Sequence, residues 1–142
     1  MTNYKYHKDG TEPNNGEIFV FGSNLAGRHG AGAAKLALQK YGALYGVGYG
    51  RMDQSYGIPT KDENLNTLDL TTIKLHVYSF LWLAFTRPDL QFWMTSVGCG
   101  LAGWTPAHIA PMFRCAPDNI NFPDTWKEYL EKENNALRNR QM

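Results

Sequence analysis

The chain of 142 residues has little of what marks membrane, secreted or zinc-binding proteins. Its two cysteines, Cys99 and Cys115, lack the close spacing of a zinc site, and so few cysteines are typical of reduced thiols. The longest apolar run, 77–85, is interrupted by Ser79 and is too short to span a bilayer. Residues 1–15 are polar and lack the apolar segment of a signal peptide. We therefore expect a cytoplasmic protein with no membrane partner, no metal and no cofactor.

An excess of charge of one sign is also missing. Fourteen basic and thirteen acidic residues leave a formal net charge of +1, whereas proteins that bind duplex nucleic acid usually carry a larger basic excess. The chain has no Gly-Lys-Ser/Thr sequence, which excludes a phosphate-transfer loop. Hydrophobic residues make up 43% of the chain and aromatic residues 13%, which suffices for a core, so we expect one domain over residues 1–142.

Apolar runs and glycine-rich segments alternate along the chain and predict alternating strands and helices. We expect a short edge strand near the N-terminus and further strands at 18–21, 54–60, 90–97 and 119–122. We expect helices at 30–41, 71–85 and 106–113, and a last helix from about 123 that carries Leu137, Arg138 and Arg140. Either Asp69 or Thr71 can cap the helix at 71–85. This alternation predicts an α/β domain of three layers, α/β/α, with a mixed, mostly parallel sheet.

Two glycine-rich loops follow predicted strands and precede predicted helices. The first, 22–32, leads into the helix formers Ala33 and Ala34, and the second, 98–103, leads into the cap and first-turn proline Thr105-Pro106. Glycine lets backbone N–H groups approach a ligand, and a helix N-terminus adds partial positive charge, so each loop suits a phosphate. Because both loops follow parallel strands, we expect them to face one crevice that holds a nucleotide-like ligand.

The glycine pattern leaves two alternatives open. Asp53 lies about twenty residues after the first loop, as the acidic residue of a dinucleotide-binding fingerprint does, but Lys35 stands where that fingerprint has a further glycine. The segment 45–50, in which glycine alternates with tyrosine and valine, is interpreted as a tight connection, and a loop beside the ligand is the alternative.

Three motifs occur in a fixed order: Asn24, Gly27 and Gly30-Ala31-Gly32 after a strand, Thr60-Lys61 at the end of a second strand, and 97–103 after a third. This order resembles macrodomains, whose first loop holds ADP-ribose and whose second holds its diphosphate, and the resemblance covers roughly residues 18–130. The Thr-Lys pair and the Gly-Cys-Gly-Leu run are similar to the branch with the terminal ADP-ribose protein glycohydrolase and the DNA ADP-ribosyl glycohydrolase antitoxins. The segment 21–27 also resembles small phage-encoded proteins, which implies a bacterial or phage-infected host cytosol.

The resemblance implies a macrodomain-like fold that binds ADP-ribose or a related nucleotide and hydrolyses ADP-ribosyl linkages on a protein or nucleic acid. Two positions depart from the family. Ala102 stands where the protein glycohydrolase has an acidic residue, and Asp9-Gly10 reverses the Gly-Asp order of the element that holds adenine. The alternatives are a non-catalytic module that sequesters or reads an ADP-ribose-type signal, and a structural protein whose loops bind no nucleotide.

Three residues are candidates for catalysis. By resemblance Lys61 meets the ribose carbon, as a nucleophile or an electrostatic clamp, and a solvated lysine beside Asp62 and Glu63 is the alternative. Asn24 either holds a ribose hydroxyl or water, or stabilises a turn. His29 either transfers a proton or has no role in the loop.

Further residues are candidates for binding. Arg28 can pair with a phosphate, while Trp104 and Tyr56 either stack on a ring of the ligand or belong to the core. Cys99 is either a nucleophile or part of the loop packing. The predicted ligand-binding residues are Gly22, Ser23, Gly27, Arg28, Gly30, Ala31, Gly32, Thr60, Gly98, Cys99, Gly100, Leu101, Ala102, Gly103 and Trp104.

Overall fold

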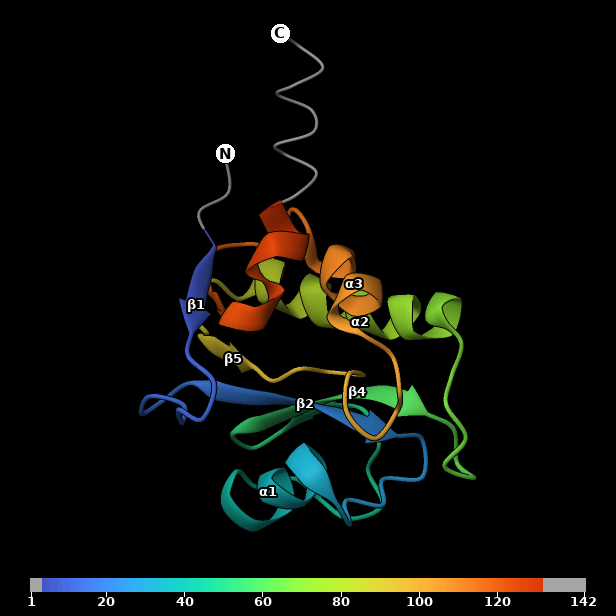
Figure 1. The fold of residues 1–142 in the computed structure, drawn as a ribbon. Coiled ribbons are helices and arrows are strands. Elements are labelled where there is room, and N and C mark those ends of the chain that lie inside the picture. Colours follow the sequence, from blue (N-terminus) through green and yellow to red (C-terminus); the bar gives the residue numbers. More distant parts are fainter. Residues whose placement is uncertain (1–3, 132–142) are drawn as a thin grey trace, which may run out of the picture.

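A computed structural model describes residues 4–131 of the chain, which form a sheet with helices on both faces (Figure 1). The strands are β1 (Lys5–His7), β2 (Ile18–Asn24), β3 (Gly50–Met52), β4 (Ser55–Lys61), β5 (Phe92–Met94) and β6 (Ile120–Pro123). The helices are α1 (Gly32–Lys40), α2 (Leu70–Thr86) and α3 (Pro106–Ile109), with the 3-10 turns η1 (Ala110–Phe113) and η2 (Asp124–Trp126). Residues 127–131 are helical, and Leu137, Arg138 and Arg140 of the expected last helix lie outside the described residues.

The strands form one sheet in the order β1-β6-β5-β2-β4-β3. Every pair of neighbours is parallel except β3 and β4, which form an antiparallel hairpin. In Figure 1, α1 covers one face of the sheet, while α2 and α3 lie on the other. The three-layer α/β arrangement with a mixed, mostly parallel sheet is therefore confirmed, and the carboxyl ends of β2, β4 and β5 meet at one edge.

The central strand β2 is buried on both faces, which explains its uninterrupted apolar sequence. Ile18 and Val20 point into the larger core, which includes Phe80 of α2 and extends under α3 and η2. Phe19 and Phe21 point into a smaller core against α1. The two-residue period of a strand thus anchors β2 in both layers and fixes the position of the loop that follows it.

Several boundaries differ from the sequence-based expectations. The strand expected at 90–97 pairs only over β5, so the residues from Thr95 onward belong to a loop. The helix expected at 106–113 is α-helical only as far as Ile109, because Pro111 has no N–H to donate to the fourth carbonyl before it. The hairpin strand β3 was not expected, and its turn places Asp53 at a positive φ of 53°.

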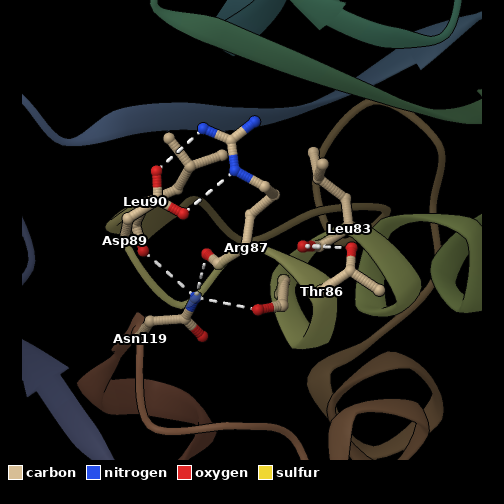
Figure 2. A network of polar contacts seen from close by, with 7 residues as sticks. Leu83, Thr86, Arg87, Asp89, Leu90 and Asn119 are labelled. Carbon is tan, nitrogen blue, oxygen red and sulfur yellow. Dashed lines mark hydrogen bonds and ion pairs between the residues drawn. The ribbon is translucent and has the colours of Figure 1, made fainter.

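Both ends of α2 are fixed by side chains. At the N-terminus the Asp69 carboxylate accepts the N–H of Thr72 at 2.8 Å, so of the two expected caps the aspartate is the one used. At the C-terminus the Asn119 amide nitrogen lies 3.0–3.2 Å from the carbonyl oxygens of Ala84, Arg87 and Leu90 (Figure 2). This contact fixes the turn that leads from α2 into β5. Within residues 4–131, no helix has both the length and the apolar composition to cross a membrane.

Candidate functional site

A cleft of about 510 Å³ opens at the carboxyl ends of β2 and β4, between the N-terminus of α1 and the loop after β5. It brings together most of the residues predicted to bind a ligand. The predicted residues that line it are Gly22, Ser23, Asn24, Arg28, Gly30, Ala31, Gly32, Thr60, Lys61, Gly98, Cys99, Gly100, Leu101 and Ala102. Four predicted residues, Gly27, His29, Gly103 and Trp104, are not part of the lining.

The N-terminus of α1 forms one wall of the cleft. Its cap residue, Ala31, has no side chain that can accept a hydrogen bond, and the first turn carries no acidic residue. The N–H groups of Gly32, Ala33 and Ala34 have no hydrogen-bond partner among residues 4–131. These unpaired donors, together with the partial positive charge of the helix end, favour an anion at this wall.

The loop after β5 forms the opposite wall. Four backbone hydrogen bonds within residues 95–104 shape it, among them the bond from the Trp104 N–H to the Gly98 carbonyl at 2.9 Å. The N–H groups of Gly100, Leu101 and Ala102 have no partner within the described residues. The two walls are close, since a Cβ placed on Gly32 would lie 3.7 Å from Cδ1 of Leu101. Unpaired backbone donors therefore flank the cleft on both sides.

The charged side chains of the cleft are all basic. Arg28 and Lys61 line it, and no aspartate or glutamate is among its lining residues. Lys61 is half-buried and forms no ion pair within residues 4–131, and the alternative of a solvated lysine beside Asp62 and Glu63 stays open. The Asp62 carboxylate instead accepts the N–H groups of Asn64 and Asn66, at 2.8 and 2.9 Å. The cleft thus presents two uncompensated cations to a ligand.

The Asn24 side chain is used by the first loop itself. Its amide oxygen accepts the Arg28 N–H at 2.9 Å, and its amide nitrogen donates to the Arg28 carbonyl at 2.8 Å. Asn24 is buried at the cleft wall, so of its two predicted roles the structure supports the turn-forming one. The role of this side chain toward a ribose stays a prediction.

His29 was predicted as a proton-transferring residue of the cleft, but its side chain is turned away from it. The ring is buried, and its Nε2 lies 2.9 Å from the carbonyl oxygens of both Leu44 and Val47. Phe21 packs edge-on against the imidazole, with the two ring centroids 5.3 Å apart. The segment 44–50 folds against the back of the loop and offers the imidazole these two acceptors. The His29 side chain therefore does not line the cleft, where it was expected.

The segment 44–50 packs so tightly that Gly27 also belongs to this contact rather than to the cleft. A Cβ on Gly27 would lie 2.3 Å from the Val47 nitrogen, and the Gly46 N–H donates to the Gly27 carbonyl at 2.9 Å. Ser23 donates its hydroxyl to the carbonyl of Gly48. We call the segment 44–50 the brace. The brace supports the first loop, as a tight connection would, and it also contributes Tyr45 to the cleft lining. The two interpretations of this segment, a tight connection and a loop beside the cleft, therefore each hold in part.

Seven lining residues were not predicted: Ala33, Ala34, Tyr45, Leu65, Thr95, Ser96 and Val97. The last three were assigned to a strand, and the early end of β5 is what exposes them. Leu65 lies in a turn closed by the Lys61–Thr67 bridge and has a φ of +65°. Leucine rarely adopts a positive φ, so the sequence does not indicate this turn or its contribution to the lining.

Cys99 and Trp104 serve the packing of the second loop. Burial raises the pKa of the Cys99 thiol to about 11, and Sγ donates to the Val97 carbonyl at 3.4 Å, so a protonated thiol rather than a thiolate is present near pH 7. The Trp104 indole donates to the Leu68 carbonyl at 3.1 Å, outside the cleft. Gly103, with a φ of +87°, closes the turn by donating to Gly100.

Two further candidates, Tyr56 and Asp53, do not line the cleft. Tyr56 is buried in the larger core, edge-on to Phe80 with ring centroids 5.1 Å apart, so its core interpretation is confirmed. Asp53 lies against Gly42, beyond the C-terminal end of α1, whereas the cleft is at the N-terminal end. This placement removes the acidic partner that a dinucleotide-binding fingerprint requires.

Residues 4–131 contain no group of three histidine, cysteine or acidic side chains placed to hold a metal ion. Both cysteines are free thiols. Comparison of the chain with protein-family models, with curated proteins and with solved structures finds no match. The functional argument therefore depends on the geometry of the cleft and on the motifs of the sequence.

Proposed function

We propose that this protein is a binding module for ADP-ribose or a closely related nucleotide, held by its diphosphate in the cleft. The observation that carries the proposal is the pair of walls with unpaired N–H groups, which flank Arg28 and Lys61 without a carboxylate among the lining residues. A diphosphate satisfies such donors and offsets both cations. The cleft volume of about 510 Å³ is within the usual range for small-molecule sites.

The sequence motifs favour ADP-ribose among the nucleotides that carry a diphosphate. The order of the two loops and the Thr60-Lys61 strand end resembles macrodomains, as set out above, and each of these motifs now contributes to one cleft. Tyr45, Leu65 and Leu101 add apolar surface at the same cleft, which suits the less polar parts of a nucleotide. Membership of the macrodomain family is part of the proposal.

Hydrolysis of an ADP-ribosyl linkage on a protein or nucleic acid is the second candidate function. Lys61 favours it, because its ammonium lines the cleft without an ion-pair partner in the described chain. The lack of a lining carboxylate disfavours it, since general acid–base help then needs a group from outside the lining. Binding without turnover is therefore the main proposal.

Calorimetric titration with ADP-ribose tests the proposal, with inorganic diphosphate as competitor and adenosine as a ligand that lacks phosphate. We expect ADP-ribose to bind, diphosphate to compete and adenosine to bind far more weakly. Lys61→Gln and Arg28→Gln should each weaken binding about tenfold or more, since each removes a charged hydrogen bond. Lys35→Gln is the matched control, because Lys35 is an exposed cation of α1 outside the lining.

Two outcomes would count against the proposal. A flat titration with ADP-ribose would refute nucleotide binding at this cleft, and equal losses in the Lys35 and Lys61 variants would refute the assigned contact. Incubation with ADP-ribosylated protein or DNA then separates the two candidate functions. Release of ADP-ribose that disappears in Lys61→Gln would establish the hydrolase, whereas tight binding without release would establish the module.

A further inference from the structure

Helix α2 has the composition of an internal helix but is covered on one side only. Among its seventeen residues Lys74 is the single lysine, arginine or acidic side chain, and the side toward the sheet is buried in the larger core. On the other side a stripe of Leu75, Tyr78, Trp82 and Phe85 is exposed by 63, 50, 72 and 56%, respectively. Lys74 and Ser79 are also exposed on this side, but four large apolar side chains in one row form an exposed apolar patch of the kind that marks an interaction surface.

The rest of this chain does not supply that partner. The stripe is exposed in the presence of all the described elements. Residues 132–142 contain only two large apolar side chains, Leu137 and Met142, among eleven residues that are mostly charged or amide-bearing. Such a segment offers too little apolar surface to match four large apolar side chains, so within these 142 residues the stripe has no complement of similar composition and a second copy of the chain is favoured as the partner.

The spacing of the stripe makes it complementary to itself. Steps of three, four and three residues keep the four side chains in a line along the helix axis. A second α2 that runs antiparallel about a two-fold axis places Tyr78 opposite Trp82 of the other copy, and Leu75 opposite Phe85. Both copies then use the same surface, as in the interfaces of most homodimers.

The area and charge of the stripe fit this arrangement. If each side chain contributes roughly 100 Å², two copies cover roughly 800 Å² of apolar surface. The polar rim brings the total toward the 1,200 Å² or so at which specific interfaces begin. The Lys74 ammonium, 5.8 Å from the centre of the Tyr78 ring, forms no ion pair within residues 4–131. In the antiparallel pair it lies at the C-terminal end of the other helix, where the helix dipole favours a cation, and the Asp89 carboxylate there is paired with Arg87 of its own chain.

We infer that this protein forms a two-fold symmetric homodimer through the exposed stripe of α2. The dimer leaves both clefts intact, because no stripe residue is among the cleft lining. This inference is independent of the proposed ligand. It commits to a second copy of this chain as the occupant of the stripe, and a lipid surface is the competing occupant that the test must separate.

Sedimentation velocity of the full chain, in reducing buffer so that exposed Cys115 cannot cross-link, measures the dimer directly. We expect a concentration-dependent species of twice the 16.1 kDa chain mass at micromolar concentrations. Trp82→Glu should raise the dimer dissociation constant by about 30-fold or more, since it removes a large aromatic side chain from the centre of the interface. Leu44→Glu is the matched control, because Leu44 is 57% exposed on the opposite side of the sheet, and it should leave the dimer unchanged.

Circular dichroism melting establishes that each variant is folded, and Phe85→Glu is the second variant if Trp82→Glu is not. A wild-type chain that is monomeric at high micromolar concentration would overturn the inference, as would a dimer that Trp82→Glu leaves intact. A monomer that co-sediments with phosphatidylcholine vesicles, and does so less after Trp82→Glu, would assign the stripe to a lipid surface and would also overturn it.

Discussion

The two walls of the cleft carry similar glycine-rich sequences but are held in place very differently. The first loop, 22–32, is supported from behind by the brace, through His29, Gly27 and Ser23. The second, 95–104, is held by its own turn and by hydrogen bonds to other elements: Thr95 donates to the Val20 carbonyl of β2, the Thr67 hydroxyl donates to the Ala102 carbonyl, and the Trp104 indole donates to the Leu68 carbonyl. Glycine therefore has two roles here: Gly27 of the first wall packs backbone on backbone, whereas Gly100 and Gly103 of the second wall have open space where a side chain would lie.

The largest expected effect is on the contact between the first loop and the brace. A Cβ on Gly48 would lie 2.3 Å from the Asn24 carbonyl oxygen, and the backbone there does not need a positive φ, so sterics alone are tested. We expect Gly48→Ala to lower the free energy of unfolding by about 3 kcal/mol, measured by urea denaturation.

Gly100→Ala is the matched control in the second loop. Gly100 also has no positive φ, and a Cβ there would meet no atom within 4 Å. The free energy of unfolding should change by less than about 0.5 kcal/mol. Equal stabilities of the Gly48 and Gly100 variants would contradict the difference between the two walls.

The next effect concerns the His29 imidazole. His29→Phe keeps a ring against Phe21 but removes the donor from the Leu44 and Val47 carbonyls, so we expect a loss of about 1.5 kcal/mol of stability. His108→Phe, at an exposed histidine, should change stability little. If thermal melting showed no loss for His29→Phe while hydrolysis was lost, the catalytic prediction for this residue would regain support.

A smaller effect is expected where Thr67 supports the second loop. Its hydroxyl donates to the Ala102 carbonyl at 2.8 Å, and Thr67→Val keeps the shape without the donor. We expect a loss of about 1 kcal/mol and faster hydrogen exchange at the Gly103 and Trp104 amides. The Gly46 amide, which bonds to the first loop, should keep its exchange rate. Acceleration at all three amides would mean that the walls are not independent.

The smallest effect changes reactivity rather than stability. Because burial raises the pKa of Cys99 to about 11, its thiolate at pH 8 is about a hundredfold scarcer than that of an ordinary thiol, and its alkylation rate should rise with pH up to that value. Mass spectrometry after maleimide treatment should find exposed Cys115 modified first. Fast labelling of Cys99 in Cys115→Ser at pH 7 would argue for the nucleophile that the structure disfavours.

The glycine positions after apolar runs were enough to predict both walls, because strand, loop and helix are encoded locally. The brace was not predictable in the same way. Gly27 meets Gly46 and Val47 only after β2, α1 and the β3–β4 hairpin are assembled, and no local pattern records that contact. The same holds for His29. Its position in the loop is evident from the sequence, but the turn of its side chain away from the cleft depends on the brace.

The end of β5 shows a second limit of the sequence. Residues 95–97 have strand-forming types, but after the Thr95 N–H, which donates to the Val20 carbonyl of β2 at 3.0 Å, neither β2 nor β6 continues the pairing, so the chain turns into the cleft wall. Pro111, by contrast, predicts the end of α3 through its missing N–H, a signal that the helical periodicity of 106–113 had masked.

The pairing of β1 with β6 joins the two ends of the described chain and has a consequence for folding during synthesis. The edge strand β1 pairs with β6, so Lys5 lies beside Asn121, and the Tyr6 hydroxyl donates to Glu131 at 2.7 Å. The first strand of this sheet in sequence order thus has no partner until the last one has been synthesised. During synthesis β2, β4 and α2 can assemble around their own core, whereas β1 stays unpaired until β6 has emerged and then completes the sheet.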